Sequence, residues 1–193
     1  MHILTSLEGN VNTIGPRSCY DEGKRVCETL IYEYNKVYNL DCKIVRLFNT
    51  YGPSKKACYA GPKMALDDGR VITNFIGKIL ENKPVQIYGS GEQTRSFCFI
   101  DDMLKGLISM MGSKEFGPIN LGNDTCEFTL NELVKAFERV LDREILVEHL
   151  EGTVDDPKTR KPVLTKARER LGFECKVKLD DGIKKTCEWF GLK

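Results

Sequence analysis

The chain has 193 residues, of which 41% are hydrophobic and 30% are charged, a composition typical of one globular body with a real core. Its formal net charge is +1, and Lys and Arg are interspersed with Asp and Glu, which argues against a polycation that binds nucleic acid. No apolar run approaches the roughly 20 residues that cross a membrane, and residues 1–10 lack the features of a secretion signal. We therefore expect no membrane segment in this chain.

Eight cysteines are spread along the chain, at positions 19, 27, 42, 58, 98, 126, 175 and 187, and none belongs to a Cys-x-x-Cys pair. Several fall in apolar or helical patterns, where a free thiol behaves as a small hydrophobe. We predict reduced core thiols in a cytosol-like compartment, with a metal site or disulfides as the alternative. Because His2 and His149 are the only histidines, we expect no histidine-ligated metal.

The first long element is a helix. Residues 10–16 are predicted to form a loop, and Ser18 is the expected N-cap of a helix over 20–38. Four apolar residues form a stripe along that helix: Val26, Leu30, Tyr34 and Val37. Residues 42–48 predict a strand, and residues 49–53 a turn at its carboxyl end, the edge where open parallel sheets bind ligands.

Helices and strands alternate through the rest of the chain. The pattern predicts a helix over 71–82, a strand over 85–88, a glycine-rich turn over 89–95, a strand over 96–100 and a helix that Asp101 and Asp102 cap and that reaches Met111. It then predicts a strand over 118–121, a capping box from Thr129 to Glu132, a strand over 144–149 and helices over 164–171 and 181–190. With no repeat and no Gly/Ser hinge, the order indicates one compact α/β body.

Tyr20 and Lys24 stand four positions apart at the start of the first helix, and therefore share one of its faces. A nearby ammonium favours the phenolate and lowers a phenol pKa that starts at about 10. A tyrosine of this kind can transfer protons near neutral pH. Taken alone, the pattern fits a solvated surface pair as well.

Five motifs follow in order: Asn12-x-Ile-Gly-Pro-Arg-x-Cys-Tyr-Asp-Glu-Gly-Lys-Arg25, Arg46-Leu-Phe-Asn-Thr-Tyr-Gly-Pro53, Asp68-Gly-Arg-Val71, Tyr88-Gly-Ser-Gly-x-Gln-Thr-Arg95 and Asp155-Asp-Pro-x-x-Arg-Lys-Pro162. Together they resemble the extended short-chain dehydrogenase/reductases. The Cys-Tyr-Asp-Glu-Gly-Lys-Arg string and the last motif resemble the UDP-glucuronic acid decarboxylase (UDP-xylose synthase) branch. The resemblance covers nearly the whole chain from about Gly9 onward.

The resemblance implies NAD-dependent decarboxylation of UDP-glucuronate to UDP-xylose. In that family C4 of the glucuronic acid loses hydride to NAD+ while the tyrosine takes the hydroxyl proton. The β-keto acid then loses CO2, and the ketone is reduced again. Tyr20 would be the acid/base, and Lys24 would lower its pKa and hold the nicotinamide ribose. Thr50 would join these two residues in the cofactor site.

The same resemblance implies a substrate site of seven residues: Asn49, Arg70, Val71, Tyr88, Gln93, Arg95 and Arg160. Guanidinium groups suit a diphosphate, and Arg160 would also act in catalysis, as a fixed cation that orients the substrate carboxylate. From the residues alone, blander interpretations stay open. The 89–91 glycines can form a hairpin turn, Asn49 can cap a turn, and Arg70 and Arg160 can be solvated charges.

Three departures from the family pattern affect the interpretation. No Gly-x-x-Gly-x-x-Gly precedes Tyr20, Glu8 stands closer to Tyr20 than the family's glutamate does, and residues 54–62 resemble an insertion. We therefore expect the C-terminal part of a Rossmann-type extended reductase, with a partial parallel sheet and a small substrate-binding α/β domain. Residues 1–53 would be a remnant of the dinucleotide-binding domain, and residues 54–193 mainly the nucleotide-sugar domain, intertwined with the first.

Two functional alternatives remain beside the decarboxylase. One is a non-catalytic fragment that binds a UDP-sugar or pairs with a full-length subunit, and the other is a different extended reductase, such as a sugar-nucleotide epimerase or 4,6-dehydratase. The resemblance also implies a homodimer formed through the 20–38 helix. The expected compartment is the cytoplasm, or the Golgi lumen if a membrane anchor precedes this chain.

Overall fold

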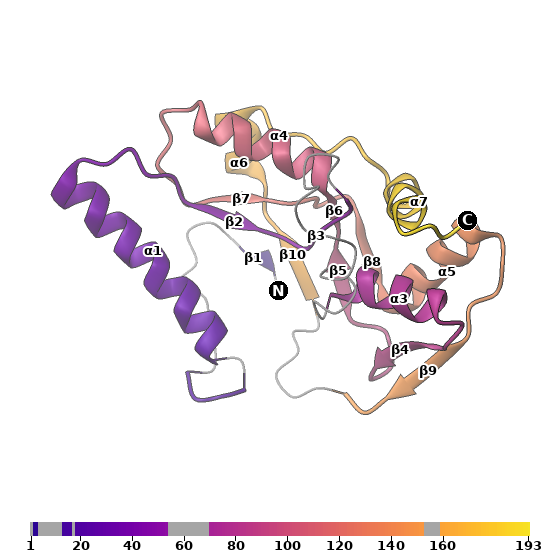
Figure 1. The fold of residues 1–193 in the computed structure, drawn as a ribbon. Helices are drawn as coiled ribbons and strands as arrows, with labels where there is room; N and C mark the ends of the chain where they lie inside the picture. Colours follow the sequence, from indigo (N-terminus) through magenta and orange to yellow (C-terminus); the bar gives the residue numbers. More distant parts are fainter. Residues whose placement is uncertain (1, 4–12, 17, 54–69, 153–158) are drawn as a thin grey trace.

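Figure 1 shows the computed structural model of the chain, which describes residues 2–3, 13–16, 18–53, 70–152 and 159–193. The helices are α1 (Ser18–Tyr38), α3 (Val71–Leu80), α4 (Ile100–Met111), α5 (Leu130–Leu141), α6 (Thr165–Leu171) and α7 (Leu179–Trp189). The strands are β1 (His2–Ile3), β2 (Val45–Leu47), β3 (Thr50–Tyr51), β4 (Val85–Tyr88), β5 (Thr94–Ser96), β6 (Cys98–Phe99), β7 (Ile119–Leu121), β8 (Glu127–Thr129), β9 (Val147–Leu150) and β10 (Thr159–Pro162).

The described strands pair mostly in parallel. A four-stranded sheet has the order β1-β10-β5-β8, in which only β5 and β8 run antiparallel. The pairs β2–β7, β3–β6 and β4–β9 are parallel as well. Parallel neighbours joined through helices are characteristic of a Rossmann-like α/β fold, so the predicted fold class is confirmed. The pairing of β2 with β7 and of β3 with β6 links the two predicted parts of the chain. The boundary after residue 53 stays a prediction.

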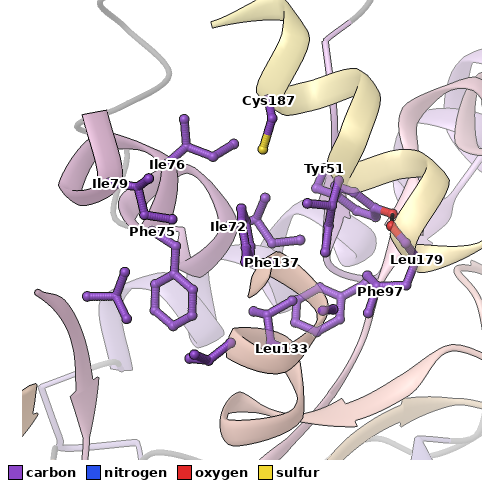
Figure 2. Close-up of a cluster of buried hydrophobic side chains, with 14 of the residues drawn as sticks. Tyr51, Ile72, Phe75, Ile76, Ile79, Phe97, Leu133, Phe137, Leu179 and Cys187 are labelled. Carbon is purple, nitrogen blue, oxygen red and sulfur yellow. Dashed lines mark hydrogen bonds between the residues drawn. The ribbon is translucent and has the colours of Figure 1, made fainter. Parts of the chain in front are cut away.

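Two clusters of buried side chains form the core. The larger one packs α3, α5 and α7 against β3 and β4, as Figure 2 shows. In it the rings of Phe75 and Phe137 lie 5.9 Å apart, and both side chains are almost fully buried. Tyr51 donates its hydroxyl to the carbonyl of Leu179 at 3.4 Å, and burial raises the pKa of this tyrosine well above its usual range. The second cluster lies between β6, β7, α4 and α6.

α1 differs from the other helices because none of its residues is buried. In Figure 1 it stands to one side of the sheets. The predicted helix is confirmed, but its apolar stripe faces away from the core: Val26 is 54% exposed, Leu30 52%, Tyr34 53% and Val37 65%. The described part of the chain therefore leaves a long apolar helix face without a cover.

Two predictions at helix and strand ends are wrong. Ser18 is the first residue of α1 and not its N-cap, and its hydroxyl donates to the carbonyl of Gly15 at 2.8 Å. The predicted strand over 96–100 is broken at Phe97: Ser96 is the last residue of β5, which also includes residues 94–95 of the predicted turn, and Cys98–Phe99 form β6. Helix α4 then begins at Ile100, immediately after β6.

The sequence predicted that Asp102 caps α4, but the structure shows that it does not. It lies in the first turn, is fully buried, and its carboxylate accepts the backbone N–H groups of Lys176 and Val177 at 2.8 Å each. The carboxylate therefore joins α4 to the segment that leads into α7. This contact spans a long sequence distance, which explains why a local pattern could not reveal it.

The prediction of core thiols is correct for only some of the cysteines. Three described cysteines are buried: Cys98, Cys126 and Cys187. Cys19 and Cys27 are exposed on α1, where the helical pattern was mistaken for a core pattern. Cys58 lies outside the described residues. No helix in the described ranges is long and apolar enough to cross a membrane.

Candidate active site

Tyr20 and Lys24 occupy the first two turns of α1. The Nζ of Lys24 lies 5.4 Å from the centroid of the Tyr20 ring, as the spacing of the two residues predicts. Tyr20 is 61% exposed, so a ligand has access to its phenol. The ammonium therefore lies near the tyrosine ring, and the catalytic role of the pair stays a prediction.

A bidentate ion pair holds α1 to β2. Arg46 donates from Nε and Nη2 to the two carboxylate oxygens of Glu28, at 2.7 Å in each case. The hydrogen bond to Glu28 raises the pKa of Arg46, and such a fork fixes the planes of both groups. Sequence analysis missed this pair. Its signal was Glu28, which stands four positions after Lys24 and therefore on the same helix face.

Asn49 and Thr50 follow the carboxyl end of β2. Asn49 has a φ of 33°, in the left-handed region that asparagine tolerates. Its Nδ2 donates to the carbonyl of Ser96 at 3.0 Å, and its own carbonyl accepts the backbone N–H of Cys98 at 3.2 Å. These bonds fix the turn against β5 and β6. The Thr50 hydroxyl is buried and has no hydrogen-bond partner among the described residues.

Arg70 lies close to this turn. Its Nη1 donates to the carbonyl of Thr50 at 3.5 Å, the long limit for a hydrogen bond. The residue is exposed and directly precedes α3, whose first residue, Val71, packs against the larger core cluster. The predicted Arg70 and Val71 are therefore anchored at the start of a core helix.

The glycine-rich segment after Tyr88 is a turn between strands of different pairs. β4 pairs with β9, whereas β5 pairs with β10 and β8, so the turn is not a hairpin. The Nε2 of Gln93 donates to the carbonyl of Tyr88 at 2.7 Å and closes the turn. Gly91 has a φ of 80°, and its carbonyl accepts the N–H of Asn131, at the start of α5, at 3.3 Å. Sequence analysis did not predict the contribution of Asn131.

Arg95 and Arg160 are register partners on the parallel strands β5 and β10, although they lie far apart in the sequence. Thr94 pairs with Thr159 in the same way. Arg95 donates from Nη1 to the carbonyl of Thr94 at 2.8 Å, and the side chain of Arg160 lies outside the described part of the structure. The backbone register therefore brings the two predicted arginine positions to neighbouring strands.

Hydrogen bonds and strand pairing thus connect most of the predicted site. They link the 49–50 turn to β5 and to Arg70, and they place the 88–95 segment beside β10. Tyr20 and Lys24 are not part of this group, because they lie on α1, which Figure 1 shows apart from β5 and β10. Among the described residues, the Arg46–Glu28 ion pair joins this helix to the strand leading to Asn49.

The residues present fit the nicotinamide end of NAD. The Tyr20–Lys24 couple supplies a phenol and an ammonium, and the buried Thr50 hydroxyl without a described partner is a polar group that a ligand can satisfy. The sequence contains no Gly-x-x-Gly-x-x-Gly before Tyr20, so the fit does not extend to the pyrophosphate. Among the described residues no group of three or more potential metal ligands gathers.

The parallel α/β sheets and the Tyr-x-x-x-Lys helix define an extended short-chain dehydrogenase/reductase. Residues 5–122 match the model of the NAD dependent epimerase/dehydratase family, and the chain belongs to this family. The family recognised from the motifs is therefore confirmed.

Curated relatives point to the same branch. The chain is 46% identical over 185 residues to UDP-glucuronic acid decarboxylase 5 of Arabidopsis thaliana, a match that covers 96% of this chain and 51% of the relative. It is 40% identical over 182 residues to UDP-glucuronic acid decarboxylase 1 of Xenopus tropicalis, covering 94% of this chain and 41% of the relative. The chain thus spans about half the length of the relatives it matches.

Solved structures give the same fold. UDP-glucuronic acid 4-epimerase from Bacillus cereus, in complex with UDP-glucuronic acid and NAD, is similar with a TM-score of 0.77 and 26% identity, over 98% of this chain and 61% of that one. DesIV, a dTDP-glucose 4,6-dehydratase from Streptomyces venezuelae with NAD and TYD bound, has a TM-score of 0.80 at 22% identity, over 99% and 55%. The second match supports the fold alone.

Proposed function

We propose that this chain carries the acid/base couple and the nucleotide-sugar site of an enzyme that converts UDP-glucuronate into UDP-xylose and CO2 with NAD+. The observation that carries the proposal is the register of Arg95 opposite Arg160, which pairs two motif positions predicted to bind an anionic sugar nucleotide. Relatives named UDP-glucuronic acid decarboxylase, 46% identical over most of this chain, support the choice of reaction.

Each residue has a definite task in this reaction. The Tyr20 phenolate takes the proton of the C4 hydroxyl and returns it at the end, and the Lys24 ammonium compensates the phenolate charge. Bound NAD+ would supply the hydride acceptor for C4, and the resulting NADH would supply the hydride that reduces the ketone. Arg160 orients the substrate carboxylate, and Arg95 binds the diphosphate. When the C5–C6 bond breaks and CO2 leaves, its electron pair forms an enolate with the C4 ketone, and C5 then takes a proton from solvent. Thr50 orients the nicotinamide end, and Asn49 the sugar.

The remaining predicted contacts define the uridine side of the site. Tyr88 and Gln93 are joined within the turn, and Arg70 directly precedes α3. An aromatic ring, an amide and a guanidinium suit a base and its phosphates. Val71, the first residue of α3, would contact the same ligand. The glycines of the turn allow the backbone to approach the nucleotide.

Calorimetry with UDP-glucuronate tests this site. The chain should bind the ligand, and Arg95→Ala should weaken binding by about tenfold or more, because a charge-assisted contact to the diphosphate is lost. The matched control is Arg143→Ala, which removes an exposed arginine beyond the end of α5. Absence of binding at millimolar UDP-glucuronate, or equal losses in both variants, would reject the proposed site.

The second candidate is a chain that binds the UDP-sugar without converting it. Under this alternative, the chain binds UDP-glucuronate in calorimetry as in the first proposal, but it forms no UDP-xylose.

The exposed face of α1 supports a further proposal, a homodimer. Its apolar residues are each more than half exposed, and a second copy of the helix would cover them. The compartment that we propose is the cytoplasm, on the basis of the cysteine spacing.

A further inference from the structure

The carboxylate of Glu127 joins three strands of the four-stranded sheet. Glu127 belongs to β8, and its Oε1 accepts the hydroxyl of Thr94 on the neighbouring β5 at 2.7 Å. Its Oε2 lies 3.2 Å from the Nζ of Lys161 on β10. Because β5 lies between β8 and β10, the Lys161–Glu127 ion pair crosses over β5.

This ion pair is more sheltered than an ordinary surface pair. The two side chains are 28% and 24% exposed, whereas the lysine of the Lys135–Glu138 pair on α5 is 70% exposed. Partial burial reduces screening by water and salt, and the Thr94 hydroxyl limits the positions that the carboxylate can take. The geometry therefore restrains Lys161 more than a solvated lysine.

Lys161 directly follows Arg160 in the Arg-Lys-Pro motif, whose lysine has no task in the proposed reaction. Among the described residues, the ladder between β10 and β5 has two register pairs, Thr159–Thr94 and Arg160–Arg95. Two register pairs alone hold a strand weakly. The ion pair adds a third connection immediately beside the two arginine positions.

We infer that Lys161 is a positioning residue, which acts through Glu127 to hold β10 on β5 and so keeps Arg160 opposite Arg95. This inference rests on the proposed function, in which Arg160 meets the carboxylate of UDP-glucuronate. Lys161 itself does not touch the substrate. Its loss should therefore affect the ligand that carries the carboxylate more than one that lacks it.

The test compares UDP with UDP-glucuronate, by calorimetry on the whole chain. Lys161→Met keeps most of the side-chain length and removes the charge, Lys161→Arg keeps the charge, and Lys135→Met breaks the exposed α5 pair as the matched control. Lys161→Met should weaken the binding of UDP-glucuronate by about tenfold and the binding of UDP by less than about twofold. Lys161→Arg and Lys135→Met should both stay within about twofold of the unmodified chain.

If the ion pair had a purely structural role, Lys161→Met would weaken the binding of both ligands by the same factor. That result, or no change in either affinity, overturns the inference. If the unmodified chain binds neither ligand, the proposed function fails, and hydrogen exchange decides the inference alone. The Arg160 amide should then exchange about tenfold faster in Lys161→Met than in Lys161→Arg or Lys135→Met. Equal exchange rates in the three variants would overturn it.

Discussion

Replacing the buried carboxylate of Asp102 should destabilise the chain by about 2–4 kcal/mol. The carboxylate accepts two backbone N–H groups at 2.8 Å, and a hydrogen bond to a charged group contributes about 1.5–3 kcal/mol. The sum is reduced because Lys176 is exposed, so water can reach its N–H group after the change. The partner Lys105 adds little, because its side chain is 62% exposed in the 3.2 Å pair.

Three variants separate these contributions in urea unfolding followed by circular dichroism and by the fluorescence of Trp189, the only tryptophan, on α7. Asp102→Ala should lose about 2–4 kcal/mol, and Asp102→Asn about half of that, because an amide oxygen can still accept. Lys105→Ala should lose less than about 0.5 kcal/mol. The reasoning is refuted if Asp102→Ala changes the free energy of unfolding by less than about 0.5 kcal/mol, or if Lys105→Ala costs as much.

Three further predictions concern other parts of the chain. Iodoacetamide at pH 8, followed by mass spectrometry, should label the exposed Cys27 first and leave Cys126 unlabelled. Burial raises the pKa of the Cys126 thiol to about 11, so only about one Cys126 thiol in a thousand is ionised at this pH. Equal labelling of the two cysteines would contradict this prediction. Gly91→Ala should lower the free energy of unfolding in urea by about 1–3 kcal/mol, because φ is 80° and the Asn131 side chain of α5 occupies the place of a Cβ. Gly172→Ala should lower it by about 1 kcal/mol, because φ is 60° but the space around a Cβ is open. The reverse order of the two losses would contradict this geometry. Leu30→Glu should convert a dimer into a monomer in analytical ultracentrifugation, because it places a charge in the exposed α1 stripe, and an unchanged sedimentation coefficient would reject the dimer through this helix.

Local patterns predicted the elements that local physics determines. The strand over 85–88 was predicted with its observed bounds, because two buried residues alternate with more exposed ones. The capping box is present as predicted: the Thr129 hydroxyl accepts the N–H of Glu132 at 3.0 Å, and the glutamate carboxylate accepts the Thr129 N–H at 2.8 Å. Both signals lie within a few residues of sequence.

Contacts between distant segments could not be predicted in the same way. The sequence gives Asp102 the appearance of a helix cap, and only the folded chain places it against residues before α7. The motifs suggested that Arg95 and Arg160 share a site, but their register depends on the pairing of β5 with β10. Helical periodicity identified the stripe on α1, and it contains no information on what covers that stripe.

The central claim is that this chain takes part in the decarboxylation of UDP-glucuronate. Its most direct test is incubation of the chain with NAD+ and UDP-glucuronate labelled at the carboxyl carbon. The complete mixture also contains the N-terminal half of the Arabidopsis relative, and a second mixture omits it. That N-terminal half without this chain serves as the blank. We expect labelled CO2 and unlabelled UDP-xylose in the complete mixture. Tyr20→Phe should abolish both products, because it removes the hydroxyl that moves the C4 proton. Label that remains in UDP-glucuronate, or in its 4-epimer, in the complete mixture would contradict it.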